Sequence, residues 1–113
     1  MITSPKWEIE FFDERVENQI KGWPDDIYAD FLRLAGLIQD YGADLRLPHS
    51  RAMGKGLFEL RCKGREGIGR AFYCMRLGRR IVILHGFIKK TQETPDKELR
   101  IARKRQRDVL DDR

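Results

Sequence analysis

The sequence predicts a single α+β domain: an antiparallel sheet with two N-terminal helices on one face, the other face free, and a C-terminal helix. Three observations support this. The 113 residues, 41% of them hydrophobic, suit one compact core. Segments with the alternation of strands or the three-to-four-residue spacing of helices follow one another as strand, helix, helix, three strands and helix. No repeat or linker interrupts them, so residues 1–113 are expected to form one domain.

The chain begins with a predicted strand and a short helix. Trp7–Phe11 alternates apolar and acidic residues, which is typical of a strand with one buried face. Asp13 can cap a helix that runs to about Lys21. This helix must end before Pro24, because proline has no backbone N–H to donate and disfavours helix at the preceding residue.

A second helix is predicted from Pro24 to Tyr41. Proline is acceptable in the first turn, and the acids Asp25 and Asp26 lie where the helix dipole favours them. Gly42 is the expected end. The apolar residues recur at spacings of three and four and form one stripe that can pack on a sheet: Ile27, Phe31, Leu34, Ala35, Ile38 and Tyr41.

Residues 43–56 are interpreted as a loop, because Pro and Gly lie there among basic residues. Three strands are then expected in close succession, over residues 57–62, 69–76 and 80–87. The β-branched run of the last of them predicts the most buried strand of the sheet.

The first of these three strands separates two kinds of side chain. Its alternation places Phe58, Leu60 and Cys62 on one face. Glu59 and Arg61 therefore occupy the opposite face, which is the one expected to be free of helices.

A last helix is predicted from Pro95 to about Leu110. Thr94, Pro95 and Asp96 supply a capping hydroxyl, a first-turn proline and a first-turn acid. A narrow contact stripe is expected from Leu99, Ala102, Val109 and Leu110. The rest of the helix surface is basic.

Charge divides the chain sharply. Residues 1–50 hold five Lys/Arg against ten Asp/Glu, a net of −5, whereas residues 51–107 hold seventeen against five, a net of +12. A basic half of this strength indicates a polyanionic partner, because Lys and Arg that neutralise phosphates release condensed counterions. Nucleic acid is the first expectation, an acidic protein the second and an anionic membrane surface the third.

The remaining composition predicts a cytoplasmic protein without metal or cofactor. The N-terminus lacks a secretory pattern, and no apolar run is long enough to span a membrane. Cys62 and Cys74 lie in apolar strand-like runs, with neither a CxxC pair nor clustered histidines. Both are interpreted as reduced core thiols.

Three motifs carry a family resemblance. They are Gly56–Arg61, Gly69–Tyr73 and Ile83–Thr91, the last followed by Thr94-Pro95. Together they resemble the phage-derived Gp49-like/HigB branch of the RelE/ParE toxin superfamily. The likeness covers nearly the whole chain, and its most specific element is the Phe-x-Lys-Lys-Thr string of residues 87–91.

The resemblance implies a RelE-like fold and the toxin of a type II toxin–antitoxin pair. RelE and HigB members bind in the ribosomal A site and cleave messenger RNA, whereas ParE members of the same fold inhibit DNA gyrase. The implied partner is an antitoxin, often a helix-turn-helix protein such as HigA. An acidic antitoxin segment would match the basic half of the chain.

The candidate catalytic residues are all cations. RNA cleavage through its own 2′-OH needs a proton acceptor, a proton donor and positive charge for the transition state. The sequence contains no paired histidines and no clustered carboxylates opposite the basic loop, so fixed positive charge is expected to dominate and no metal is required. By resemblance, the catalytic residues are Arg61, Arg70, Lys89 and Lys90. A dense positive field would lower the pKa of either lysine and suit it to proton transfer.

Further residues are expected to bind RNA, namely Arg51, Lys55, His85, Arg103 and Arg107. Several roles stay open at this point. His85 is either structural or catalytic, and Glu59 either pairs with an arginine or accepts a proton. Phe87 either packs in the core or stacks on a base, and it stands where relatives place a hydroxyl or an imidazole, so the general acid is unassigned.

Three functions fit the sequence. The leading one is a ribosome-dependent endoribonuclease that cleaves messenger RNA and inhibits translation. The alternatives are a ParE-like gyrase inhibitor and a non-catalytic nucleic-acid-binding protein from a prophage. Fold alone does not separate them, because one fold supports several activities.

Overall fold

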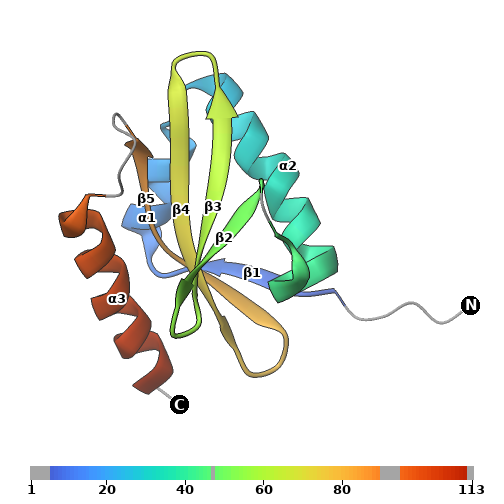
Figure 1. The fold of residues 1–113 in the computed structure, drawn as a ribbon, viewed down its shortest axis with the longest axis vertical. Helices are drawn as coiled ribbons and strands as arrows, with labels where there is room; N and C mark the ends of the chain where they lie inside the picture. Colours follow the sequence, from blue (N-terminus) through green and yellow to red (C-terminus); the bar gives the residue numbers. More distant parts are fainter. Residues whose placement is uncertain (1–5, 47, 90–94, 112–113) are drawn as a thin grey trace, which may run out of the picture.

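A five-stranded sheet forms the centre of the molecule, with helices packed on both faces (Figure 1). The computed structural model describes residues 6–46, 48–89 and 95–111. The strands are β1 (Glu8–Phe11), β2 (Ser50–Gly54), β3 (Leu57–Gly64), β4 (Gly67–Arg76) and β5 (Arg80–Lys89). The helices are α1 (Glu14–Lys21), α2 (Asp25–Tyr41) and α3 (Asp96–Asp111), with a short 3₁₀ turn, η1, at Gly42–Asp44. The α+β class and the expected helices are thus confirmed.

The sheet differs from the prediction in two ways. The order is β1-β5-β4-β3-β2, and β1 pairs with β5 in parallel, so the sheet is mixed rather than antiparallel. Ser50–Gly54, expected to be loop, is an edge strand that pairs antiparallel with β3. Neither feature leaves a pattern in the sequence, because both depend on pairing with a distant segment rather than on local alternation.

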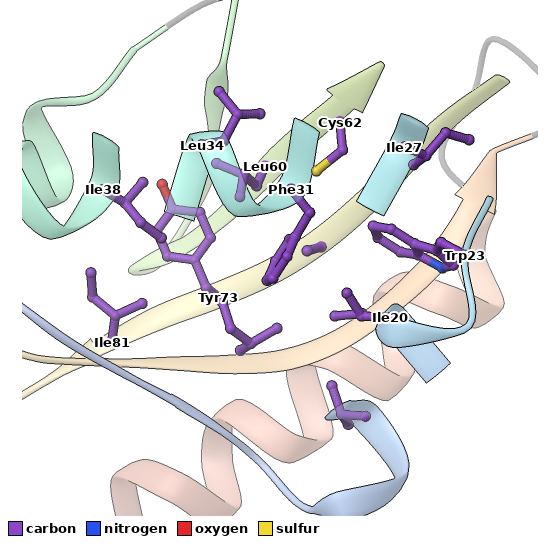
Figure 2. Packing of buried hydrophobic residues seen from close by; sticks show 13 residues of the cluster. Ile20, Trp23, Ile27, Phe31, Leu34, Ile38, Leu60, Cys62, Tyr73 and Ile81 are labelled. Carbon is purple, nitrogen blue, oxygen red and sulfur yellow. The ribbon is translucent and has the colours of Figure 1, made fainter. Parts of the chain in front are cut away.

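One core lies between the sheet and the two N-terminal helices. The apolar stripe of α2 packs on side chains from β3, β4 and β5, and Figure 2 shows Ile27, Phe31, Leu34 and Ile38 in one cluster with Leu60, Cys62, Tyr73 and Ile81. Tyr41, predicted to belong to this stripe, is instead 57% exposed at the last position of α2. α1 adds Val16 and Ile20, and its N-terminus is capped as expected by Asp13, which accepts a hydrogen bond from Val16 N at 3.0 Å.

The second face is not free of helices, which corrects the prediction. α3 packs there on a second core built from Leu57, Phe72, Cys74, Val82, Leu84 and Phe87. Of the expected contact stripe, Ala102 is buried and Leu99 and Val109 are partly buried. Gln106 is also buried, and the cost of burying its amide is offset by a hydrogen bond of 2.8 Å that its side chain donates to the backbone carbonyl of Lys55. α3 therefore docks through part of the expected apolar stripe and through polar contacts, and the polar contacts leave no periodic pattern in the sequence.

Other predictions about the core are confirmed. Residues 81–87 of β5 are all buried, so it is the most deeply placed strand. Cys62 and Cys74 are free, buried thiols. None of the helices in the described ranges has the length and apolar character that crossing a membrane requires.

Candidate nucleic-acid interface on the second sheet face

Four cations gather on the second face of the sheet, near the end where β3 turns into β4. In the strand register, Arg61 lies opposite Arg70, and Arg70 lies opposite Phe87 on β5. Arg51 on β2 lies opposite Glu59 on β3. Directly opposed residues project to the same side of a sheet. We call the set Arg51, Arg61, Arg70 and Lys89 the cationic cluster.

A buried carboxylate lies within the cationic cluster. Glu59 has no exposed surface, and its Oε1 accepts a hydrogen bond of 2.7 Å from Nη1 of Arg70, which is itself 3% exposed. The Nη2 of Arg51 lies 3.5 Å from the same oxygen, and the side chain of Arg51 remains 45% exposed. Glu59 therefore pairs with arginines, which answers the alternative that the sequence left open.

Arg61 contributes a half-buried guanidinium beside this pair. Its Nε is buried and has no hydrogen-bond partner among the described residues. Its backbone N–H donates to the carbonyl of His49 at 2.9 Å, which ties β3 to the segment before β2. A buried donor of this kind costs free energy unless a ligand or water meets it, so it is suited to an anionic ligand.

Lys89 lies at the end of β5 and is half-buried. Desolvation and then the positive charge of Arg70 lower the pKa of its ammonium group below the usual range. The carboxylate of Glu59 opposes this effect, while Arg61 and Arg51 add to it. The direction is the one expected from a dense positive field, and it makes Lys89 a better proton-transfer group near neutral pH.

Three other predicted residues lie away from the cationic cluster or outside the described part. Lys55 is exposed in the β2–β3 turn with φ 54°, beside α3. Arg103 donates to the carbonyls of Met53 at 2.7 Å and Gly54 at 2.9 Å, so its guanidinium fastens α3 to the end of β2. Lys90 lies outside the described residues.

His85 is a link between β5 and α3 rather than an exposed contact. It is 6% exposed, and its Nε2 is hydrogen-bonded to Glu98. Nη1 of Arg105 lies 3.3 Å from His85 Nδ1, and because arginine can only donate, Nδ1 is the acceptor and Nε2 carries the proton. Arg105 also donates to the carbonyl of Leu84 at 2.8 Å.

The open alternative for Phe87 is also answered, because its ring is 8% exposed and packs on Phe72 at 5.8 Å between centroids. It belongs to the core.

The outward side of α3 carries a second basic surface, which we call the α3 stripe. Its members are exposed and recur at spacings of three and four: Lys97, Arg100, Lys104 and Arg107. Of these, only Arg107 was singled out from the sequence. The stripe is about 15 Å long, given a rise of 1.5 Å per helical residue.

Sequence reasoning left the role of Glu59 open and did not select Glu98 or Arg105 for the site. The sequence pattern that points to Glu59 is the alternation of β3, which places its side chain on the same face as Arg61. No sequence pattern points to Glu98 or Arg105, because they reach His85 only through the docking of α3 on the sheet. Within the described residues, groups of three or more His, Cys, Asp or Glu side chains placed to hold a metal ion do not occur.

The fold and the cationic cluster define a class: a small α+β domain that concentrates guanidinium and ammonium groups around a buried carboxylate on its sheet. Residues 18–107 match the family model described as "Phage derived protein Gp49-like (DUF891)", and the chain belongs to this family of RelE/ParE-like toxins. The Gp49-like resemblance drawn from the motifs is thereby confirmed. A search among curated proteins found no match to the chain.

Proposed function

We propose that this protein is a HigB-like toxin of a type II toxin–antitoxin pair, a cytoplasmic endoribonuclease that cleaves messenger RNA in the ribosomal A site. The observation that carries the proposal is the cationic cluster, in which Arg61, Arg70 and Lys89 share one sheet surface with the buried carboxylate Glu59. Guanidinium groups suit phosphate because their planar fork donates two parallel hydrogen bonds and stays charged.

The proposed reaction uses the 2′-OH of the substrate as the nucleophile. Lys89, as the free amine, accepts the 2′-OH proton while the 2′-oxygen forms a bond to phosphorus. The bond from phosphorus to the 5′-oxygen breaks, and a water molecule supplies the proton that this oxygen takes up. The products are a 2′,3′-cyclic phosphate and a 5′-hydroxyl end. Arg61 and Arg70 stabilise the charge that develops on the non-bridging oxygens.

The partners follow from charge. Ribosomal RNA offers phosphates to the α3 stripe, while the messenger occupies the cationic cluster. The proposed antitoxin is a helix-turn-helix, HigA-like protein whose acidic segment pairs with one of these basic surfaces, because opposite charge speeds and orients association.

The test uses two substitutions that leave the buried pair intact. Arg70→Ala is avoided, since it would leave Glu59 buried and uncompensated, which costs about 3–5 kcal/mol. Arg61→Ala removes a transition-state donor and is expected to lower messenger cleavage in a translating extract by about 10²–10³-fold. Lys89→Arg keeps a positive charge but cannot accept a proton, because a guanidinium stays protonated near neutral pH, and it is expected to lower the rate by about 10²–10⁴-fold with little change in RNA binding.

Arg33→Ala is the matched control, because Arg33 lies on α2, where it forms an exposed ion pair with Asp30. It should cleave as the wild type does. Folded Arg61→Ala and Lys89→Arg proteins that cleave at the wild-type rate would remove the proposal. Growth arrest with a DNA-damage response and intact messengers would instead establish a gyrase inhibitor, and no growth arrest would establish a non-catalytic binding protein.

A further inference from the structure

Glu59 is the most deeply buried charged side chain among the described residues, and stability does not explain it. Its exposed fraction is 0%. Taking a carboxylate and a guanidinium out of water costs several kcal/mol per ion, and apolar replacements of such pairs are often neutral or stabilising. The other rows of this face show that the sheet can bury apolar side chains, as it does with Phe72 and Phe87. The pair of Glu59 with Arg70 therefore points to a role in arranging the site.

The geometry shows what the carboxylate arranges. A single oxygen, Oε1, lies 2.7 Å from Arg70 Nη1 and 3.5 Å from Arg51 Nη2. These guanidinium groups come from β4 and β2, the two neighbours of β3. One buried atom thus draws together cations from the strands on either side, against their mutual repulsion.

Proton transfer by Glu59 itself is disfavoured by the same geometry. The carboxylate has no exposed surface, and its Oε1 already accepts from Arg70. A general base must come within hydrogen-bond reach of the proton it takes, and a substrate hydroxyl has no open path to this group.

We propose that Glu59 is a positioning residue, whose buried carboxylate fixes the guanidinium groups of Arg70 and Arg51 in the alignment that an RNA phosphodiester requires. This inference rests on the proposed endoribonuclease function. It adds that the cationic cluster works as a unit organised by its one described acid.

The charges around Lys89 give the proposal a second consequence. Lys89 faces Arg70 on β4, Glu59 and Arg61 on β3, and Arg51 on β2, while α3 contacts β5 through Glu98 at His85. Among the charges on β2, β3 and β4, Glu59 is the one that raises the pKa of Lys89. Its neutralisation should lower that pKa further, and the cleavage rate, which rises with pH as the amine is freed, should reach half of its plateau at a lower pH.

The experiment compares three variants. Glu59→Gln removes the charge and offers the guanidinium an amide, and Glu59→Asp keeps the charge but withdraws the carboxylate by one carbon–carbon bond. Glu10→Gln is the matched control, because Glu10 also pairs with two arginines, Arg76 at 3.4 Å and Arg80 at 2.5 Å, on β4 and β5 near their connecting turn. Each is measured for folding, for kcat and KM, and for the pH dependence of cleavage.

Glu59→Gln is expected to lower kcat by about 10–100-fold with KM unchanged or reduced, because misplacing a reacting group by about 1 Å can cost 10²-fold while the net positive charge rises. Its pH midpoint should move to lower pH. Glu59→Asp should lose kcat without moving that midpoint, and Glu10→Gln should change neither. Wild-type kcat in folded Glu59→Gln and Glu59→Asp proteins would overturn the proposal.

Nuclear magnetic resonance gives a readout that does not depend on cleavage. The Arg70 ¹⁵Nη signals should be resolved and slow to exchange with solvent in the wild type, because Nη1 donates to Glu59, and averaged in Glu59→Gln. The ¹³Cε shift of Lys89 should titrate at lower pH in Glu59→Gln than in the wild type. If the wild type does not cleave RNA, the proposed function is wrong. The Arg70 and Lys89 resonances would still show whether Glu59 positions Arg70. An Arg70 signal that already averages in the wild type overturns the inference alone.

Discussion

At the scale of single residues, Tyr73 shows how a buried polar group joins two strands. Its ring is fully buried between α2 and the sheet, and its hydroxyl lies 2.6 Å from Ser50 Oγ on the edge strand β2. Burial raises the pKa of the Tyr73 hydroxyl, so the group stays protonated and hydrogen-bonded over the physiological range. Ser50, also buried, has its hydroxyl satisfied by this contact.

Tyr73→Phe is predicted to lower the free energy of unfolding by about 1–3 kcal/mol, because it leaves the buried Ser50 hydroxyl without a partner. Urea unfolding followed by circular dichroism measures the change. Ser50→Ala in the Tyr73→Phe background is the control, and the double variant should lose less than the sum of the two single changes. Strict additivity would mean that the hydrogen bond contributes nothing.

The alternation of residues in a strand predicted which face of the sheet a side chain occupies, but not which side chain of another strand it contacts. The alternation of β3 correctly put Glu59 and Arg61 on the face opposite Leu60 and Cys62. It could not show that Glu59 would meet Arg70, because that contact depends on the pairing register of two strands, which is fixed by the turn and by the buried faces together.

At the scale of elements, glycines show how closely helices approach the sheet. A Cβ on Gly86 of β5 would lie 2.7 Å from Cγ1 of Ile20 and 3.1 Å from the ring of Trp23. Gly36 in the middle of α2 is different, since a Cβ there would have no neighbour within 4 Å. The same residue type therefore serves close packing at one position and only weakens a helix at the other.

Gly36→Ala is predicted to stabilise the protein by about 0.5–1 kcal/mol, because alanine loses less backbone entropy in a helix. Gly86→Ala is predicted to destabilise it by about 1–3 kcal/mol, because the added methyl group must displace packed side chains. Thermal unfolding of the two variants beside the wild type measures both. A rise in unfolding temperature for Gly86→Ala would show that α1 can move away from the sheet without cost.

α3 shows how an element can look different in sequence and in structure. The sequence indicated a single basic surface on this helix, but in the structure its basic residues form one inward-facing set and one exposed set. Arg103 and Arg105 turn inward and donate to backbone carbonyls of β2 and β5. The α3 stripe faces outward. Helical spacing separates the sides of a helix, but which side meets the sheet depended on polar contacts that no periodicity reveals.

At the scale of the whole molecule, the charge asymmetry of the sequence becomes an asymmetry between layers. The acidic first half of the chain supplies α1 and α2 on one face of the sheet, and the basic second half supplies the cationic cluster and α3 on the other. A molecule divided in this way approaches a polyanion with its basic side first.

Changing all four residues of the α3 stripe to Gln is predicted to weaken binding to a short RNA and to reduce the slope of log affinity against log salt by about 3, given roughly 0.7–0.9 per phosphate contact. Fluorescence anisotropy at several salt concentrations measures the slope. A charge-matched control changes four exposed cations that precede β2: Lys6, Arg15, Lys21 and Arg33. Equal slopes for the two variants would contradict a directed basic surface.

Local sequence patterns predicted the α+β class, the three helices, four of the five strands, the face of each β3 side chain and the basic character of the second half. These follow from local periodicity and composition, which act over a few neighbouring residues. Four features became visible only in the folded molecule: the edge strand β2, the parallel pairing of β1 with β5, the docking of α3 and the burial of Glu59 beside Arg70. Each of these joins segments far apart in the chain, and their contacts are fixed by packing and hydrogen bonding that exist only once the sheet has assembled.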